Sequence, residues 1–183
     1  MLPTFAVTLL LLQATQTYSA FILVENGGPW GGWGGTQSCP EGTSARGFSL
    51  LVESPQGRGD DTALNAIKLY CAEPYSTTVK ATVTSSAGGW GHWTRVQWCP
   101  SGDIVSFSLK VEQPIDGDDT AANNIMFQCS DLTILTGDGG PWGDFGGWSD
   151  ICYSGVCGIR TRVEGSQGKG DDTSLNDVQL RCC

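Results

Sequence analysis

Three glutamates recur at equivalent places along the sequence and could supply acid–base chemistry. Glu53, Glu112 and Glu164 each follow a valine, at the end of a short stretch of alternating apolar and polar residues. Cleavage or transfer of a glycosidic bond typically uses two carboxyl groups about 5–10 Å apart. The same alternation favours a solvated outer face for these side chains, because they fall opposite the apolar positions. The glutamates are therefore catalytic candidates only if the fold brings two of them together.

Tryptophan and glycine occur together at three places, around Trp30, Trp90 and Trp142. Exposed indole rings stack on sugar rings, so a groove lined by these residues would suit an oligosaccharide. A glycine-flanked tryptophan is more often packed in a core, because glycine lets the backbone pass close to the ring. We therefore expect core positions for the repeated tryptophans. Trp98 has no repeat counterpart and is the better candidate for a surface residue that binds a glycan.

A Gly-Asp-Asp-Thr element occurs three times, at Gly59–Thr62, Gly117–Thr120 and Gly170–Thr173. Its aspartates, together with an asparagine three residues further on, offer oxygen ligands that suit Ca²⁺. The same residue types form tight turns, because Asp and Asn bond to the nearby backbone and Gly adopts positive φ. A full EF-hand pattern is missing. We therefore expect turn chemistry here, with no metal and no other cofactor.

The whole chain divides into three similar blocks. Each block opens with a Gly/Trp turn, runs to a first cysteine and continues through two alternating stretches that flank the Gly-Asp-Asp-Thr element. The second aspartate stands ten residues before the closing cysteine in every block: Asp61 to Cys71, Asp119 to Cys129 and Asp172 to Cys182. Strict alternation predicts half-buried antiparallel strands, and no stretch shows a sustained helical period. The pattern predicts an all-β fold of three sheets related by a pseudo-threefold axis.

Eight cysteines are placed so that the repeat itself predicts their pairing. Zinc sites usually need closely spaced cysteine pairs, and only Cys152 and Cys157 come near that spacing, so we expect disulfides. The equivalent pairs in the three blocks are Cys39–Cys71, Cys99–Cys129 and Cys152–Cys182. Cys157 and Cys183 remain, and we expect them to bond to each other. The swapped pairing, Cys152–Cys183 with Cys157–Cys182, stays open.

The first 19 residues have the character of a secretory signal peptide. The run from Phe5 to Leu12 is apolar but too short to span a bilayer, and Thr17 and Ser19 offer small residues before a cleavage point. The rest of the chain, residues 20–183, is expected to form a single domain with repeats at about 21–76, 77–131 and 132–183, since a block of about 50 residues buries its apolar face poorly. The expected product is secreted and extracellular.

The charge balance excludes several classes of partner. The chain carries 10 Lys+Arg against 19 Asp+Glu, a formal net charge of −9. Basic residues scattered along such an acidic chain argue against nucleic-acid binding and against docking on an anionic membrane. An acidic protein attracts basic proteins over long range, and lysozyme-like proteins are partners of that kind.

The repeated motifs resemble the vitelline membrane outer layer protein 1 family over about Phe21 to Cys183. They are the Gly-Gly-Pro-Trp-Gly-like openings, the Gly-Asp-Asp-Thr-x-x-Asn turns and the paired cysteines. The resemblance implies a β-prism, in which three Greek-key sheets form the walls of a triangular prism. It also implies a secreted protein of egg coats or of mucosal and glandular fluids, and a transfer activity on N-acetylglucosamine oligomers. Block two departs from the pattern, because it lacks the proline and is one residue shorter before Gly117.

We therefore expect a non-catalytic structural component of an extracellular coat or of a glandular or mucosal fluid, in contact with coat or secretion proteins. Two alternatives stay open. One is a lectin-like module that binds N-acetylglucosamine oligomers (chito-oligosaccharides). The other is a glycosyl transferase that acts on these oligomers through Glu53, Glu112 or Glu164. The sequence leans against an enzyme, because it offers no defined catalytic pair.

Overall fold

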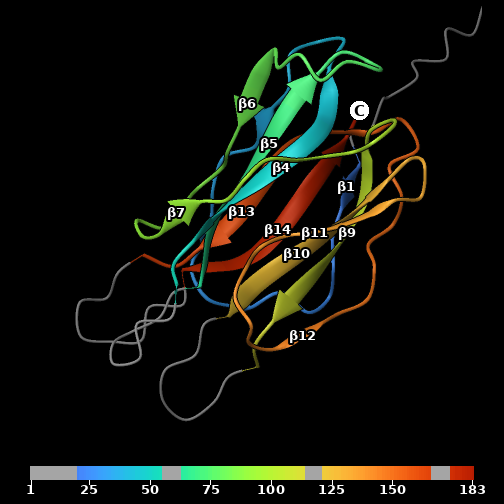
Figure 1. Cartoon of the computed structure of the whole chain (residues 1–183). Coiled ribbons are helices and arrows are strands. Elements are labelled where there is room, and N and C mark those ends of the chain that lie inside the picture. Colours follow the sequence, from blue (N-terminus) through green and yellow to red (C-terminus); the bar gives the residue numbers. More distant parts are fainter. Residues whose placement is uncertain (1–19, 55–62, 114–120, 166–173) are drawn as a thin grey trace, which may run out of the picture.

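The computed structural model describes residues 20–54, 63–113, 121–165 and 174–183. These residues form fourteen strands in three antiparallel sheets (Figure 1). None of the described residues belongs to a helix long and apolar enough to cross a membrane. The predicted signal peptide and the three Gly-Asp-Asp-Thr elements lie outside the described residues. The all-β fold with three sheets agrees with the prediction.

Each sheet is built on a pair of long antiparallel strands, which are the alternating stretches of the sequence. The pairs are β4 (Ser44–Val52) with β5 (Leu64–Ala72), β9 (Ile104–Val111) with β10 (Ala122–Cys129), and β13 (Val156–Val163) with β14 (Leu175–Cys182). Apolar residues on one face of each pair are buried, whereas many residues of the other face are only partly buried. Period-two patterning therefore located all six long strands.

Short strands complete the three sheets on either side of the long pairs. They are β6 (Ala81–Val83), β7 (His92–Trp93) and β8 (Gln97–Trp98) in the first sheet, β11 (Ile134–Thr136) and β12 (Asp144–Phe145) in the second, and β1 (Phe21–Ile22), β2 (Gly32–Trp33) and β3 (Gln37–Ser38) in the third. The opening residues of each block thus join the sheet of the block before it. The N-terminal strands pair with β13 and β14, which closes the ring.

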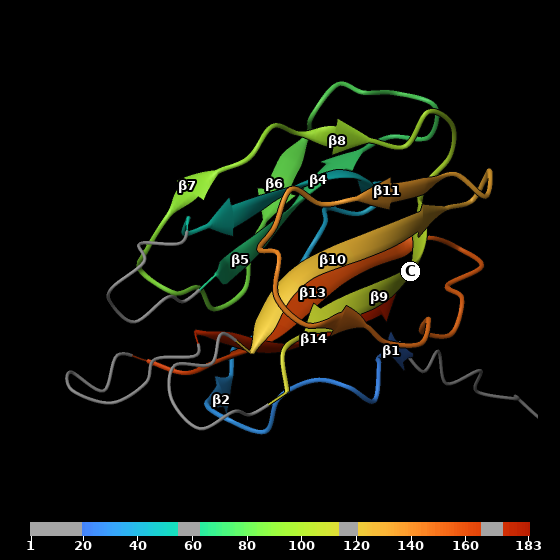
Figure 2. The ribbon, with the colours of Figure 1, turned by 60° about the horizontal axis from the view of Figure 1, so that its bottom comes forward.

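The core lies where the three sheets face one another (Figure 2). Phe48, Phe107 and Phe127 are among its largest fully buried side chains, and the rings of Phe48 and Phe127 meet edge to face with centroids 4.6 Å apart. These two residues come from different sheets. Complete burial of such a side chain contributes about 1.5–3 kcal/mol to folding. The shared core makes the three sheets interdependent.

The structure contains the three disulfides that the repeat predicts. Cys39–Cys71, Cys99–Cys129 and Cys152–Cys182 have Cα atoms 5.6, 5.7 and 5.2 Å apart, respectively. In each bond, the first cysteine follows the short strands of one sheet and the second lies in a long strand of the next sheet. The disulfides therefore link the sheets in a cycle: third to first, first to second, and second to third.

The predicted fourth disulfide is absent from this structure, where Cys157 and Cys183 are free thiols. Cys157 is buried at a register shift between β13 and β14, opposite Cys182 and Arg181. Partial burial raises the pKa of the Cys183 thiol from 9.0 to about 12, and a hydrogen bond with Cys157 adds to this rise. The two cysteines are neighbours, as their pairing by elimination predicts, but they contact each other as thiols.

Candidate functional site

Glu53, Glu112 and Glu164 follow the last residues of β4, β9 and β13, one at the end of each sheet. All three side chains are half-buried. Their backbone N–H groups donate to the carbonyls of Ala63, Ala121 and Ser174 at 2.9, 2.8 and 2.7 Å, which closes each strand pair at this end. The structure thus places the glutamates at equivalent positions of three separate sheets, and a catalytic role for them stays a prediction.

The Gly/Trp turns pack against these same strand ends. Gly31, Gly91 and Gly143 have φ angles of 77°, 99° and 70°, a region that favours glycine. A Cβ atom on any of them would lie within about 2.3 Å of a backbone atom of the strand end. The glycine, rather than the adjacent tryptophan ring, therefore makes the close contact in each turn.

Three buried asparagines hold the return strands in the same region. Asn65, Asn123 and Asn176 have no exposed surface, and each side-chain amide donates to the carbonyl two residues earlier, at 3.2–3.4 Å. The carbonyls belong to Ala63, Ala121 and Ser174, which have positive φ angles of 45°, 44° and 54°. This is the turn chemistry that the sequence predicts. The aspartates of the calcium alternative lie outside the described residues.

The prediction of core positions for the repeated tryptophans is wrong. The side chains of Trp30, Trp90 and Trp142 are 53%, 58% and 46% exposed. The core is already filled by phenylalanine and aliphatic side chains, and the turns carry the indoles outside it. These three residues are therefore available to a ligand, although they stand on three separate turns.

Trp98 is less exposed than its prediction as a surface residue implies. It is half-buried, its ring lies 5.7 Å from that of Tyr70, and it packs so closely on Gly47 that a Cβ there would approach its ring to 2.8 Å. A side chain that packs on a strand of its own sheet exposes less surface to a sugar than the tryptophans of the turns. The structure therefore ranks Trp98 below the repeated tryptophans as a binding residue.

A groove of about 560 Å³ opens between the N-terminal segment of the third sheet and the segment after β12 of the second sheet. Its lining includes Phe21, Leu23, Glu25, Trp148 and Asp150. Trp148 is 42% exposed and Leu23 is 49% exposed, while both carboxylates are exposed to solvent. The groove thus combines aromatic and apolar surface with two hydrogen-bond acceptors, at a size typical of small-ligand sites.

Asn26 lines the groove and ties the N-terminal segment to β9 of the second sheet. Its side-chain amide donates to the carbonyl of Leu109 at 2.9 Å, across 83 positions of the sequence. Its Oδ1 atom is buried and has no hydrogen-bond partner among the described residues. An unpaired buried acceptor in a native structure often marks a place where a water or ligand donor binds. Asn26 therefore carries a buried acceptor, behind the surface of the groove, that no described residue uses.

The sequence predictions placed no site at Trp148 and Asp150. One feature of the sequence could have indicated this site. The chain is one residue longer from Phe145 to Cys152 than over the equivalent stretch from Trp33 to Cys39. The extra residue lies in the segment that lines the groove, so the site breaks the threefold repeat. The other wall, with Phe21 and Glu25, comes from the far end of the sequence and required the ring closure to be known.

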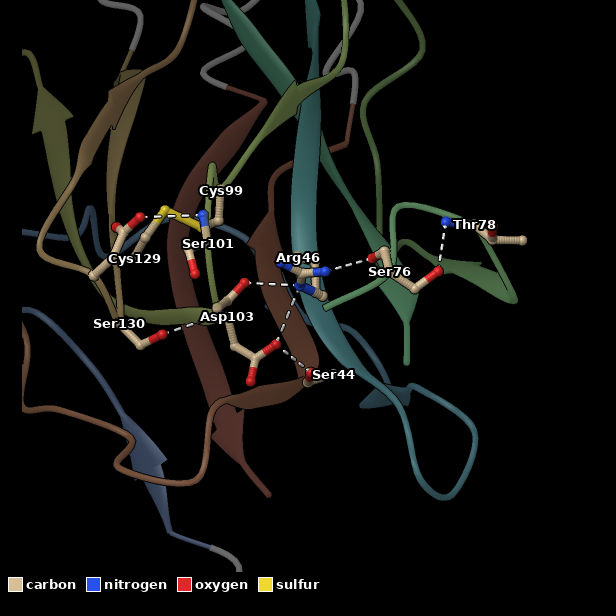
Figure 3. Close-up of polar contacts among 11 residues, drawn as sticks. Ser44, Arg46, Ser76, Thr78, Cys99, Ser101, Asp103, Cys129 and Ser130 are labelled. Carbon is tan, nitrogen blue, oxygen red and sulfur yellow. Dashed lines mark hydrogen bonds and ion pairs between the residues drawn. A yellow bond between two sulfur atoms is a disulfide. The ribbon is translucent and has the colours of Figure 1, made fainter. Parts of the chain in front are cut away.

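The disulfide end of the molecule contains a buried polar network (Figure 3). Arg46 is 3% exposed, and it donates to the carbonyls of Ser76 and Gly102 at 2.5 and 2.8 Å. Its Nε atom lies 3.6 Å from a carboxylate oxygen of Asp103, which also accepts a hydrogen bond from Ser44 at 2.7 Å. These contacts tie the loops of two sheets together, so we assign this network a structural role.

A family model for vitelline membrane outer layer protein I (VOMI) matches residues 20–183. This chain belongs to the VOMI family. A curated human relative, a vitelline membrane outer layer protein 1 homolog, is 52% identical over 96% of this chain and 93% of its own length. A mouse homolog of the same name is 46% identical over 91% of this chain and 84% of its own length. The family resemblance seen in the sequence is thus confirmed.

The VOMI chain also has the fold of jacalin-type β-prism lectins. A mannose-specific jacalin-related lectin from Morus nigra, solved in complex with mannose, superposes with a TM-score of 0.52 at 16% identity. The superposition covers 92% of the VOMI chain and 97% of the lectin. At that level of identity the likeness concerns the fold, and it confirms the β-prism that the resemblance implies.

Proposed function

We propose that this VOMI-family protein is a secreted, non-catalytic, glycan-binding component of an extracellular coat or secretion. The proposal depends on one observation, the groove that brings Trp148 and Phe21 together with the carboxylates of Glu25 and Asp150. An indole offers a flat apolar face for a sugar ring, and carboxylates accept hydrogen bonds from sugar hydroxyl or acetamido N–H groups. The carbohydrate-binding role of the β-prism lectins supports the same class of ligand.

The character of the groove favours binding over catalysis. A glycosidase or transferase needs one carboxyl group that keeps its proton at neutral pH, and burial in an apolar pocket is the usual means. Glu25 and Asp150 are both exposed to solvent, so neither lies in an apolar pocket of that kind. The half-buried Glu53, Glu112 and Glu164 stand outside the groove lining, on three separate sheets. Ligand turnover is therefore not part of the proposal.

A structural setting accounts for the remaining features. Three disulfides that link the sheets in a cycle are typical of proteins that persist in an oxidising extracellular space. The net charge of −9 would attract basic secretion proteins, such as lysozyme-like proteins, through long-range electrostatics. A protein that holds both glycans and basic proteins would cross-link the components of a coat or mucous layer.

The test is an incubation of the mature protein with an N-acetylglucosamine hexasaccharide, followed by native mass spectrometry. We expect a complex with one hexasaccharide and no oligosaccharide products of other lengths. Trp148→Ala should weaken the complex at least tenfold, because it removes the largest aromatic surface of the groove. Trp142→Ala is the matched control, since Trp142 is similarly exposed but is not part of the groove lining, and it should bind as the parent does.

Each outcome of this experiment bears on the proposal. Longer or shorter oligosaccharides would show transfer or hydrolysis and would overturn the non-catalytic assignment. A complex that Trp148→Ala leaves unchanged would place the site elsewhere. No complex at millimolar hexasaccharide would reject N-acetylglucosamine oligomers as ligands and leave a coat protein without this glycan-binding activity.

A further inference from the structure

Three arginines gather on the outer face of the third sheet, although the basic residues appear scattered in the sequence. Arg160 and Arg162 lie on β13 and Arg181 lies on β14, all at half-buried positions of the same face. Arg181 pairs with Gly158, so the three side chains occupy three successive rungs of that face. Rungs two residues apart are separated by about 6.6 Å, and the row therefore extends over about 13 Å.

The pseudo-threefold symmetry shows that this row is peculiar to one sheet. Strand pairing aligns Arg160 with Ser49 and Ser108 in the other two sheets, and Arg181 with Tyr70 and Gln128. On the strands of those two sheets, the outer faces carry one lysine each, Lys68 and Lys110. The core and turns repeat three times, whereas the arginine row does not. Its presence on a single face is thus independent of what the fold requires.

Aromatic rings and an amide hold the central arginine in place. The guanidinium of Arg160 lies 4.7 Å from the ring centroid of Phe21 and 5.1 Å from that of Trp33. Its Nε and Nη2 atoms donate to Oε1 of Gln179 at 2.9 and 2.5 Å. These contacts fix the plane of the guanidinium without neutralising its charge. A guanidinium held in this way loses little side-chain entropy when it binds an anion.

The flanking arginines also face few carboxylates, although Asp177 lies opposite Arg162 across the strand pair and its carboxyl group feels the Arg162 charge. None of the three arginines forms a salt bridge with a carboxylate of the described residues. Arg162 donates to the carbonyl of Gly31 at 3.1 Å, and the Nε atom of Arg181 is buried with no hydrogen-bond partner in the described part of the chain. Asp177 is the one acidic residue on the five strands of this sheet, and Glu164 follows the end of β13. The face therefore has an excess of positive charge within an acidic protein.

We propose that the outer face of the third sheet is a second glycan site, which binds anionic oligosaccharides that carry sulfate or carboxylate groups. Planar guanidinium groups match the oxygens of sulfate and carboxylate, and a row of three suits a chain with several anionic groups better than a single ion. Trp33, which is 37% exposed, offers an aromatic surface beside the row. The groove, with Glu25 and Asp150, would repel the same ligand.

An acidic peptide and a nucleic acid fit this face less well. Peptides that bind sheets do so mainly by adding a strand at an edge, whereas the arginines stand on the face of two central strands, β13 and β14. Nucleic acids need a broad basic surface, and the net charge of −9 works against their approach. A short anionic glycan touches only the arginine row.

The test is isothermal titration calorimetry with a heparin-derived, fully sulfated hexasaccharide at 50 mM salt. We expect the parent protein to bind it, and binding should weaken as salt rises, since the contacts are ionic. The double variant Arg160→Ser, Arg181→Gln, which copies residues of the symmetric sheets, should lose at least tenfold in affinity. Asp177→Asn should bind at least as tightly as the parent, because it removes a carboxylate from the face.

The matched control is Lys68→Gln, Lys110→Gln, which changes the net charge by the same two units on the other two sheets. The affinity of this control should stay within about twofold of the parent's. If the control loses as much affinity as the arginine variant, net charge alone attracts the ligand and the proposed site is wrong. Absence of binding by the parent would overturn the proposal outright, as would equal binding of the desulfated, N-acetylated hexasaccharide. Equal binding of polyglutamate of similar charge through the same arginines would overturn the proposal, and an acidic protein would then be the ligand of this face.

The two glycan proposals can be tested independently of each other. Trp148→Ala should leave binding of the sulfated hexasaccharide unchanged, and Arg181→Gln alone, which keeps the contact between Arg160 and Phe21, should leave binding of the N-acetylglucosamine hexasaccharide unchanged. Loss of both activities in either variant would mean one continuous site and would contradict the inference of a second one. Circular dichroism melts of all variants show whether a loss of binding reflects a loss of fold.

Discussion

At the scale of single residues, burial raises the pKa of one aspartate, whereas hydrogen bonds lower the pKa of another. Asp177 is half-buried beneath Gly27, and burial raises the pKa of its carboxyl group above 3.8, while a hydrogen bond from Val178 N–H and the charge of Arg162 oppose the rise. Asp131 is exposed, and its carboxylate accepts hydrogen bonds from the N–H groups of Thr133 and Ser101, which lower its pKa. The two carboxyl groups should therefore affect stability in opposite directions.

Asp177→Asn should stabilise the protein at pH 7. The raised pKa means that the folded state binds this proton more tightly than the unfolded chain. The contribution of Asp177 to stability is therefore fully present below its ordinary pKa of 3.8 and is lost as pH rises through the raised folded-state pKa. Thermal melts should show a gain of no more than about 1 kcal/mol at pH 7, since Val178 and Arg162 offset part of the burial cost. The gain should vanish near pH 3.

Asp131→Asn is the matched control with the opposite sign. Its lowered pKa stabilises the folded state above the ordinary pKa, and this contribution is lost as pH falls through the folded-state value. The melting temperature should therefore fall slightly at pH 7 and match that of the parent in acid. Equal effects of the two substitutions at pH 7 would show that burial does not govern Asp177.

Residue-level prediction from the sequence succeeded where the repeat supplied the constraint. The repeat identified three cysteine pairs and the turn role of Asn65, Asn123 and Asn176. It failed for the tryptophans, because recurrence beside glycine shows that a position is structurally required without showing which of the two residues makes the contact. It also failed for Cys157 and Cys183, which have no counterparts in the other blocks.

At the scale of elements, the three Gly/Trp turns each bring a glycine against the end of a long strand. A side chain at Gly91 would collide with the backbone of Val52 and Glu53, and the φ angle of 99° is itself costly for other residues. Backbone atoms cannot move aside as a flexible side chain can. The turn and the end of β4 must therefore separate if this glycine is replaced.

Gly91→Ala should thus destabilise the protein by about 2–4 kcal/mol, which combines the φ penalty with the displaced turn. Gly89→Ala is the control, because a Cβ at Gly89 meets open space and the φ angle there is not positive. Chemical denaturation should show the large loss only for Gly91→Ala. A loss of similar size for both variants would mean that the turn is sensitive to chain stiffness in general and not to this contact.

Element-level prediction depended on strand length. The long strands, eight or nine residues each, gave clear alternation and were predicted correctly. Strands of two or three residues, such as β2 and β7, contain too few positions to show a period. Their pairing with the sheet of the preceding block was invisible for the same reason. The groove beside Trp148, which depends on that pairing, could not be assembled from the sequence alone.

At the scale of the whole molecule, the N-terminal segment completes the last sheet. Phe21 pairs with Arg181 and Trp33 pairs with Arg162, while the Cys182 N–H donates to the carbonyl of Ala20 at 2.9 Å. Ile22 and Val24 from the same segment are buried in the shared core. Both glycan sites proposed above use this closure, because Phe21 lines the groove and also contacts Arg160. Loss of the segment should therefore damage the end of the chain more than its beginning.

Deletion of residues 20–38 tests this closure directly. The deletion removes β1, β2 and β3 and leaves the third sheet with only β13 and β14. Burial of Ile22 and Val24 alone contributes about 3–6 kcal/mol, so stability should fall by at least that amount.

Hydrogen exchange should show the largest loss of protection in residues 156–163 and 175–182, and a smaller loss in residues 44–52 and 64–72. Addition of a synthetic peptide of residues 20–38 should restore protection, whereas a peptide with Ile22→Asp and Val24→Asp should not. Loss centred on residues 44–72 would instead mean that each sheet is formed by a single block of the sequence.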